Sequence, residues 1–162
     1  MRVGSGKKKI LAVIVAVAGT IGCDRISKRY AAAELMGSPC RSYLADTLRV
    51  EYVENSGGFL SVGAGLPERA RKWIFVVGTS AALVGLSLGF ARRGRTIWST
   101  AGLSLIWAGG LSNLLDRLIH GRVADFLNVG IGPLRTGIFN LADLAITGGL
   151  ALVLLAGWGE KR

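Results

Sequence analysis

The feature that most constrains this sequence is the grouping of its apolar residues into four long blocks. They cover about residues 10–27, 72–90, 97–116 and 138–158 of a 162-residue chain. A helix needs about 20 apolar residues to cross the hydrocarbon core of a bilayer. Because lipid offers the backbone no hydrogen-bonding partners, each block is predicted to be a helix, and the blocks lack the alternation of a β-barrel strand. The pattern therefore indicates a single membrane domain, residues 1–162, and argues against a soluble globular fold.

The segment of about residues 31–70, between the first two blocks, is expected to leave the membrane. Gly37, Ser38 and Pro39 give a turn signal. Residues 48–53 alternate like a strand that has one wet and one dry face. We therefore expect a small, partly β extracytoplasmic excursion that rests on the membrane face. The predicted fold class is an all-α integral membrane protein with four transmembrane helices and this excursion between the first and second.

The net charge of +10 is compatible with two kinds of partner, nucleic acid or the anionic surface of a membrane. The basic residues flank the apolar blocks and do not interleave with aromatic residues, so we expect bilayer lipids as partners and no nucleic acid. An even number of spans places both termini on one side. The raw number of basic residues does not orient the chain, but their density near the span ends favours cytoplasmic termini. The residues concerned are Arg2, Lys7, Lys8, Lys9, Arg92, Arg93, Arg95, Lys161 and Arg162.

The first block also imitates a secretory signal, with a basic start followed by an apolar stretch. It ends at Thr20-Ile21-Gly22-Cys23, which is similar to the lipobox of a bacterial lipoprotein. In that interpretation Cys23 carries a lipid and residues 1–22 are removed. Thr20 stands where an aliphatic residue is usual, and three more spanning blocks follow. We therefore favour an uncleaved first span.

Ionisable and amide side chains gather where the blocks end, although a charge at membrane depth costs about 2.5–3.5 kcal/mol or more. Asp24 and Lys28 are spaced i,i+4, the favourable order for a helical ion pair. Asn113, Asp116 and Arg117 stand at i, i+3 and i+4 and so share one helical face. These groups predict a polar cluster at the membrane boundary, in a structural or a functional role.

Two further carboxyls are expected on the same side of the membrane. Asp125 is bracketed by apolar residues just after the third block, and Asp143 lies inside the fourth block, one turn after Asn140. Two carboxyls close together in a poorly hydrated site share a proton, because both cannot ionise easily. The ionised member can then activate water while the protonated member donates to a peptide carbonyl. The alternative is a pair of structural carboxyls, each held by a helix N-terminus or an arginine.

Five motifs in order complete the pattern and resemble those of a known family. They are Asp24-Arg25-Ile26-Ser27-Lys28, Asn55-Ser56-Gly57, Gly110-Leu111-Ser112-Asn113-Leu114-Leu115-Asp116-Arg117, Gly121-Arg122-Val123-Ala124-Asp125-Phe126 and Phe139-Asn140-Leu141-Ala142-Asp143. The chain resembles the bacterial lipoprotein signal peptidases (signal peptidase II). The resemblance implies a membrane aspartic endopeptidase that cuts prolipoproteins just before a diacylglyceryl-modified cysteine, without metal or cofactor. It also implies a site on the outer side of the bacterial cytoplasmic (inner) membrane and sensitivity to the cyclic peptide globomycin.

The resemblance further implies roles for individual residues. The catalytic dyad falls on Asp125 and Asp143. The positions that shape and support the site fall on Asp24, Lys28, Asn55, Gly57, Asn113, Asp116, Arg117, Asn140 and Ala142. The expected partners are lipid-modified prolipoproteins and bilayer lipids, and the expected working unit is a monomer. A rival interpretation is a non-catalytic proton or ion translocator that uses four carboxyls as a relay, which predicts carboxyls spread across the depth of the bilayer. Those carboxyls would be Asp24, Asp116, Asp125 and Asp143.

Overall fold

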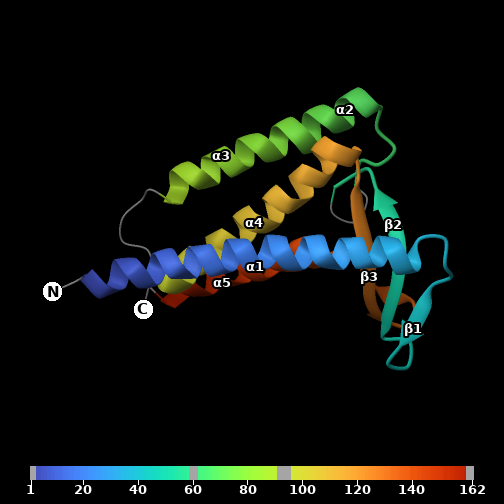
Figure 1. Ribbon diagram of the computed structural model, residues 1–162, viewed down its shortest axis with the longest axis horizontal. Helices are drawn as coiled ribbons and strands as arrows, with labels where there is room; N and C mark the ends of the chain where they lie inside the picture. Colours follow the sequence, from blue (N-terminus) through green and yellow to red (C-terminus); the bar gives the residue numbers. More distant parts are fainter. Residues whose placement is uncertain (1–2, 59–61, 91–95, 160–162) are drawn as a thin grey trace.

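The computed structural model describes residues 3–58, 62–90 and 96–159 of the chain. Long helices lie side by side, and a small sheet stands at one end of them (Figure 1). The helices are α1 (Val3–Leu35), α2 (Glu68–Lys72), the π-helical turn η2 (Trp73–Gly78), α3 (Thr79–Phe90), α4 (Ile97–His120) and α5 (Leu141–Gly159). The strands are β1 (Arg41–Tyr43), β2 (Leu48–Asn55), β3 (Val123–Ile131) and β4 (Leu134–Arg135). Both ends of the chain lie at the end of the molecule opposite the sheet (Figure 1).

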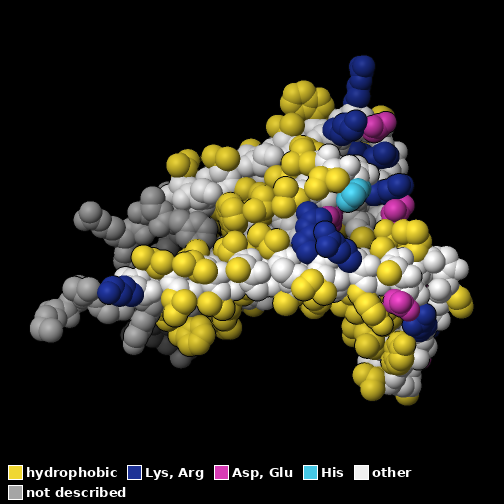
Figure 2. Space-filling view, in the orientation of Figure 1, with side chains coloured by type: hydrophobic (Ala, Val, Ile, Leu, Met, Phe, Trp, Pro, Cys, Tyr) yellow, Lys and Arg dark blue, Asp and Glu magenta, His cyan; other side chains and the backbone are white. Residues whose placement is uncertain are grey.

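Three helical stretches are long and apolar enough to cross a membrane. They are Lys9–Leu35, Glu68–Leu88, in which α2, η2 and α3 follow one another directly, and Leu141–Trp158. Large apolar side chains on these helices point outward, among them Ile14, Val84 and Leu154, which are each more than half exposed. Figure 2 shows such side chains spread along the helices. Exposed apolar surface of this extent fits contact with lipid, and the chain is a membrane protein.

Helix α4 packs against α1, α3 and α5 and is not among those three apolar stretches. Its buried face is made of small and polar residues, including Ser104, Gly109 and Asn113. The α4 and α5 backbones approach closely, since a Cβ atom on Gly102 would lie 2.6 Å from the carbonyl oxygen of Gly149. Small residues allow such close approach of membrane helices. This packing brings the polar face of α4 against the start of α5.

The strands form one four-stranded antiparallel sheet in the order β1-β2-β3-β4. The prediction of a strand at 48–53 is confirmed by β2, but the prediction of an all-α fold is wrong. Strand β3 was missed because its run is apolar with little alternation, which alone does not distinguish a strand from a buried helix. Its partner β2 lies about 70 residues earlier, and Val53 pairs with Asp125. The sheet therefore draws on two segments of the chain, one between α1 and α2 and one between α4 and α5.

The ends of the helices also differ from the predicted blocks. Helix α1 continues to Leu35, where Leu35, Ala31 and Phe126 form a buried cluster that ties it to the sheet. Helix α5 begins at Leu141 and not at 138. The predicted turn at 37–39 is confirmed, and Gly37 adopts φ +75 there. Several basic residues used above to orient the chain lie outside the described residues, namely Arg2, Arg92, Arg93, Arg95, Lys161 and Arg162.

Candidate active site

The ammonium group of Lys28 is the centre of a buried polar cluster between α1 and α4. Its Nζ atom lies 2.7 Å from Asp24 Oδ2 and 2.7 Å from Asp116 Oδ2, and donates to Asn113 Oδ1 at 2.8 Å. All four side chains are buried. A buried charge is tolerated when it is paired and its hydrogen bonds are satisfied, as here. The predicted ion pair of Asp24 with Lys28 is confirmed, and it lies inside the protein.

Asp24 connects this cluster to α5. Its Oδ1 atom accepts the backbone N–H of Ala142 at 2.9 Å, and its Oδ2 atom accepts the hydroxyl of Ser112 at 2.6 Å. The first N–H groups of a helix have no partner within the helix and carry a partial positive charge. A carboxylate from α1 therefore fixes where α5 begins relative to α4.

Asp125 points inward from β3 and is 2% exposed. Its Oδ1 atom accepts Asn140 Nδ2 at 2.6 Å, and its Oδ2 atom accepts Asn55 Nδ2 at 2.8 Å. Burial raises the pKa of Asp125 to about 6, the charge of Asp143 adds to this, and the hydrogen bonds from Asn55 and Asn140 oppose it. This carboxyl therefore changes its protonation state close to neutral pH.

Asp143 takes part in a reciprocal cap at the start of α5. Its Oδ2 atom accepts the backbone N–H of Asn140 at 3.2 Å, while Asn140 Oδ1 accepts the backbone N–H of Asp143 at 3.0 Å. This is the arrangement of a capping box, with both groups supplied by amide and carboxyl side chains. Its Oδ1 atom accepts Asn113 Nδ2 at 2.9 Å. Asp143 thus lies in the first turn of α5, because this helix begins at Leu141.

Asn140 joins the two carboxyls, because its side-chain Nδ2 donates to Asp125 Oδ1 and its backbone N–H donates to Asp143 Oδ2. These contacts bring the two carboxyls close together. Asp143 is half-buried and lines a cavity of about 440 Å³. Apolar side chains such as Phe75 and Ile146 form much of its wall. The cavity therefore has a carboxyl in a largely apolar surrounding, where charge interactions are strong.

A loop after β2 closes one side of this cavity. Asn55 Oδ1 accepts the backbone N–H of Gly57 at 2.9 Å, and Arg117 Nη2 donates to the carbonyl of Gly57 at 2.6 Å. The guanidinium carbon of Arg117 lies 5.5 Å from the ring centre of Phe75, a cation–π contact. A Cβ atom on Gly58 would come within 2.8 Å of Phe75, so this residue has no room for a side chain. The Nε atom of Arg117 is buried and has no partner among the described residues.

All eleven residues predicted for the site belong to one continuous network of contacts. They are Asp24, Lys28, Asn55, Gly57, Asn113, Asp116, Arg117, Asp125, Asn140, Ala142 and Asp143. Two partners were missed, Ser112 and Arg25, whose Nη1 atom donates to Asp116 Oδ1 at 2.7 Å. The i,i+4 spacing of Ser112 and Asp116 could have indicated Ser112 as a member of the site. No such signal marks Arg25, whose position in the sequence is that of an ordinary interfacial cation. Within the described ranges, no group of three or more His, Cys, Asp or Glu residues is placed to hold a metal ion.

Comparison with known proteins assigns the chain to a family. A profile described as signal peptidase (SPase) II matches residues 14–158. The lipoprotein signal peptidase of Syntrophomonas wolfei is 34% identical over 143 residues, which cover 86% of this chain and 90% of that protein. The lipoprotein signal peptidase of Lactococcus lactis subsp. cremoris strain SK11 is 31% identical over 156 residues, which cover 96% of this chain and 98% of that protein. A solved bacterial membrane enzyme, determined by the in meso method at 2.3 Å, has the same fold, with a TM-score of 0.75 at 23% identity, covering 100% of this chain and 92% of that one. The resemblance seen in the motifs is therefore confirmed, and the chain belongs to the signal peptidase II family.

Proposed function

We propose that this chain removes signal peptides from diacylglyceryl-modified prolipoproteins, cutting just N-terminal to the lipidated cysteine, with Asp125 and Asp143 as the catalytic dyad. Membership of the signal peptidase II family supports the aspartic peptidase class and the removal of prolipoprotein signal peptides. The observation that carries the choice of residues is Asn140, which donates its side-chain amide to the Asp125 carboxyl and its backbone N–H to the Asp143 carboxyl. No other asparagine among the described residues donates hydrogen bonds to two carboxyls.

The proposed chemistry needs one proton on the pair. The ionised carboxyl takes a proton from a water molecule, which attacks the peptide carbonyl carbon, while the protonated carboxyl donates to the carbonyl oxygen. The tetrahedral intermediate then collapses, the C–N bond breaks, and the leaving amine takes up a proton from the dyad. The pKa of about 6 for Asp125 supports a pair that holds one proton near neutrality. Asn113, Asn140 and Asn55 fix the carboxyl oxygens for this step.

We propose α4 as the fourth transmembrane helix. Its 24 residues extend over about 36 Å, enough to cross the hydrocarbon core. Its polar residues turn toward α1 and α5, where Asp24, Lys28 and Asn140 partner them. The buried polar face of α4 thus accounts for its lower hydropathy. Most of the lipid contact is made by the helices that surround α4.

We further propose that both termini are cytoplasmic and that the sheet and the site lie on the outer side of the bacterial cytoplasmic (inner) membrane. The termini lie at the end opposite the sheet (Figure 1), and the cluster of carboxyls lies at the sheet end of the helices. A lipid-modified cysteine holds its neighbouring peptide bond at the bilayer surface, at the same level. The acyl chains can stay among bilayer lipids during cleavage. A monomer suffices, because one chain supplies all eleven residues of the network.

The rival function, a proton or ion translocator, requires carboxyls at different depths of the bilayer. Here Asp24 and Asp116 share Lys28, and Asn113 and Asn140 connect that cluster to the two proposed catalytic carboxyls. The four carboxyls form one group at one end of the helices. This arrangement favours hydrolysis at a single site over transport along a path.

Substitution of each carboxyl by its amide tests the dyad. Asp125→Asn and Asp143→Asn are expected to leave an inserted protein whose processing of a lipidated precursor falls by about 10³-fold or more, because neither amide can exchange the proton. The measurement is the mobility shift of a precursor lipoprotein on a gel. Asp46→Asn is the matched control, since Asp46 is a half-exposed residue of the β1–β2 turn that pairs with Arg49. Full processing by either dyad variant would remove that residue from the mechanism.

A further inference from the structure

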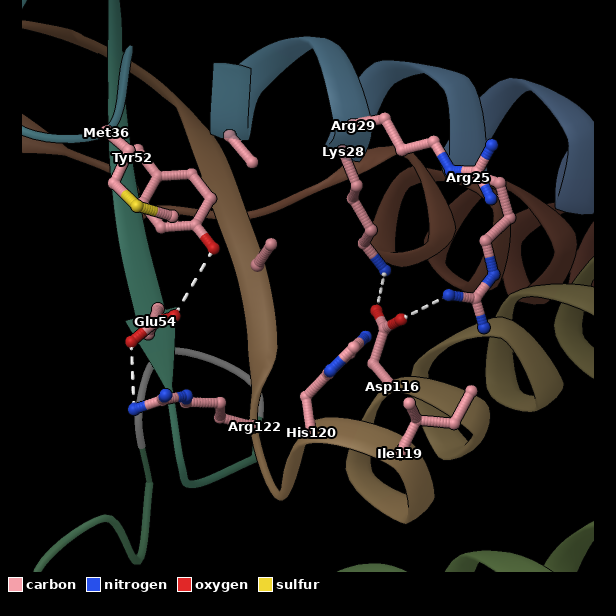
Figure 3. Close-up of a pocket in the computed structure, with 12 residues that line it drawn as sticks. Arg25, Lys28, Arg29, Met36, Tyr52, Glu54, Asp116, Ile119, His120 and Arg122 are labelled. Atoms are coloured by element: carbon pink, nitrogen blue, oxygen red, sulfur yellow. Dashed lines mark hydrogen bonds and ion pairs between the residues drawn. The ribbon is translucent and has the colours of Figure 1, made fainter. Parts of the chain in front are cut away.

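A second cavity, of about 560 Å³, lies on another side of the polar cluster and shares no lining residue with the cavity that contains Asp143. Its wall is formed by the last turns of α1, the end of α4, and the adjoining parts of β2 and β3. Figure 3 shows Arg25, Lys28 and Arg29 on its α1 side, facing His120 and Asp116 from α4. Tyr52 and Glu54 approach from β2. The proposed mechanism uses no free space in this cavity.

The charges of this cavity are only partly balanced. Asp116 is shared between Arg25 and Lys28, and Glu54 pairs with Arg122 at 2.9 Å. Arg29 has no hydrogen bond or ion pair among the described residues, and Figure 3 shows it extended along α1 toward Arg25. The guanidinium groups of Arg25 and Arg29 are thus adjacent, and Asp116 pairs with Arg25 but not with Arg29. A third charged group of negative sign would complete the arrangement.

The position of the cavity suggests where that group comes from. Ile26, Tyr30 and Ile119, on the helices that form the cavity, are 71%, 66% and 64% exposed. Figure 2 shows Lys and Arg side chains gathered at this level, with apolar side chains beside them on the helices. An arginine cluster next to lipid-facing apolar residues fits a lipid headgroup above its own acyl chains. Arginine is suited to phosphate because its guanidinium offers donors in a planar fork.

We propose that this cavity binds the phosphate of an anionic phospholipid of the surrounding leaflet, with Arg29 as its principal ligand and Arg25 beside it. The apolar surface around Ile26 and Ile119 takes the upper part of the acyl chains. The site is separate from the dyad, and its occupancy does not depend on peptide hydrolysis. The bound lipid would stand against Asp116 and Lys28 from the side opposite Asn113.

The test compares lipid binding by the full chain and by charge variants. The protein is placed in nanodiscs of phosphatidylcholine containing increasing fractions of phosphatidylglycerol, and the lipid retained after extraction is identified by native mass spectrometry. Arg29→Gln is expected to lower retention of phosphatidylglycerol about fivefold, as befits the loss of one cation near an anionic surface. Arg29→Lys keeps the charge but loses the fork, and is expected to retain an intermediate amount. Arg41→Gln, an exposed arginine of β1 that lies outside the cavity, is the matched control and should behave as the wild type.

A second arm separates a lipid from a free anion. Glycerol phosphate or inorganic phosphate, added in millimolar amounts to the protein in neutral detergent, is expected to leave bound phosphatidylglycerol in place, because neither supplies acyl chains. Displacement by the free anions would show a site for phosphate alone and overturn the lipid assignment. Equal retention of phosphatidylglycerol by the wild type and Arg29→Gln, or equal retention of both lipids by the wild type, would overturn the site itself. Arg29 is exposed and unpaired among the described residues, so folding of the variant is not at risk.

Discussion

At the scale of single residues, the same side chains hold the helices together and set up the chemistry. Lys28 joins α1 to α4 through Asp116 and Asn113, and Asn113 passes the connection on to Asp143. A change in the supporting cluster should therefore affect stability and activity together. A change in the dyad should abolish activity in a protein that still folds and inserts.

Asp116→Asn tests this distinction. Asp116 is 3% exposed and accepts from two cations, so its neutralisation leaves buried Lys28 short of a counter-charge. We expect a loss of about 3–5 kcal/mol in unfolding free energy together with lost processing, measured as the melting temperature in detergent and by the gel assay. The same change at the exposed ion pair of Glu68 with Lys72, Glu68→Gln, should cost about 1 kcal/mol or less. Lost activity at an unchanged melting temperature would mean that Asp116 acts on the substrate and not on the fold.

The raised pKa of Asp125 predicts a pH dependence of stability. A carboxyl whose pKa is about 6 when folded and near its ordinary value when unfolded binds its proton more tightly in the folded protein. Stability from this group is thus complete below about pH 4 and declines by up to about 3 kcal/mol as the pH rises through 6. Melting temperatures of the wild type minus those of Asp125→Asn should fall between pH 4 and pH 7. Parallel curves for the two proteins would show that Asp125 does not titrate in this range.

The motifs allowed the site residues to be predicted because each polar group stood next to apolar sequence. Spacing on one helix, as for Asp24 with Lys28, could be read directly and proved to be an ion pair. The contacts between different elements could not be predicted from the sequence, because they depend on how far each helix extends. The cap formed by Asn140 and Asp143 is an example, since it exists only because α5 begins at Leu141.

At the scale of elements, the contact between α4 and α5 depends on glycines at chosen positions. A Cβ atom on Gly149 would lie 2.5 Å from the carbonyl oxygen of Gly102 and 2.9 Å from Ile106 Cγ1. The neighbouring Gly148 has no atom within 4 Å of its own Cβ position. The two adjacent glycines thus face different surroundings on the same helix.

Alanine substitution separates these two surroundings. Gly149→Ala is expected to push the helices apart and cost about 1–3 kcal/mol, whereas Gly148→Ala should be neutral or stabilise α5 by up to about 1 kcal/mol. The comparison uses melting temperatures in one detergent at one pH. Equal effects of the two substitutions would contradict close backbone packing at Gly149.

The elements themselves were only partly predictable from the sequence. Strand β2 alternates and was found, whereas β3 and the pairing of Val53 with Asp125 depend on a partner far away in the chain. Periodicity reports on local surroundings, and β3 has one buried face against α1 and another against neighbouring residues of the site. Long-range pairing of this kind leaves no local signal.

At the scale of the whole molecule, the two cysteines report on the proposed orientation. Cys23 lies within the stretch Lys9–Leu35, and Cys40 lies in the segment between α1 and β1; both thiols are free and exposed. A membrane-impermeant maleimide applied to intact spheroplasts is expected to label Cys40 but not Cys23, because lipid shields the latter. Cys40→Ser should abolish labelling and Cys23→Ser should preserve it. Labelling of Cys40 only after the membrane is permeabilised would place the sheet on the cytoplasmic side.

The contact of the α4 and α5 main chains has a consequence for how such a protein can evolve. Where two backbones touch, the distance between Asn113 and Asp143 is set by main-chain atoms and by a few glycines, and not by the bulk of the residues around them. Outward-facing apolar residues can then be exchanged for others of similar hydropathy without moving the carboxyls. A solved neighbour that is 23% identical to this chain has the same fold. Most residues of the chain can therefore be substituted while the geometry of the buried polar cluster stays the same.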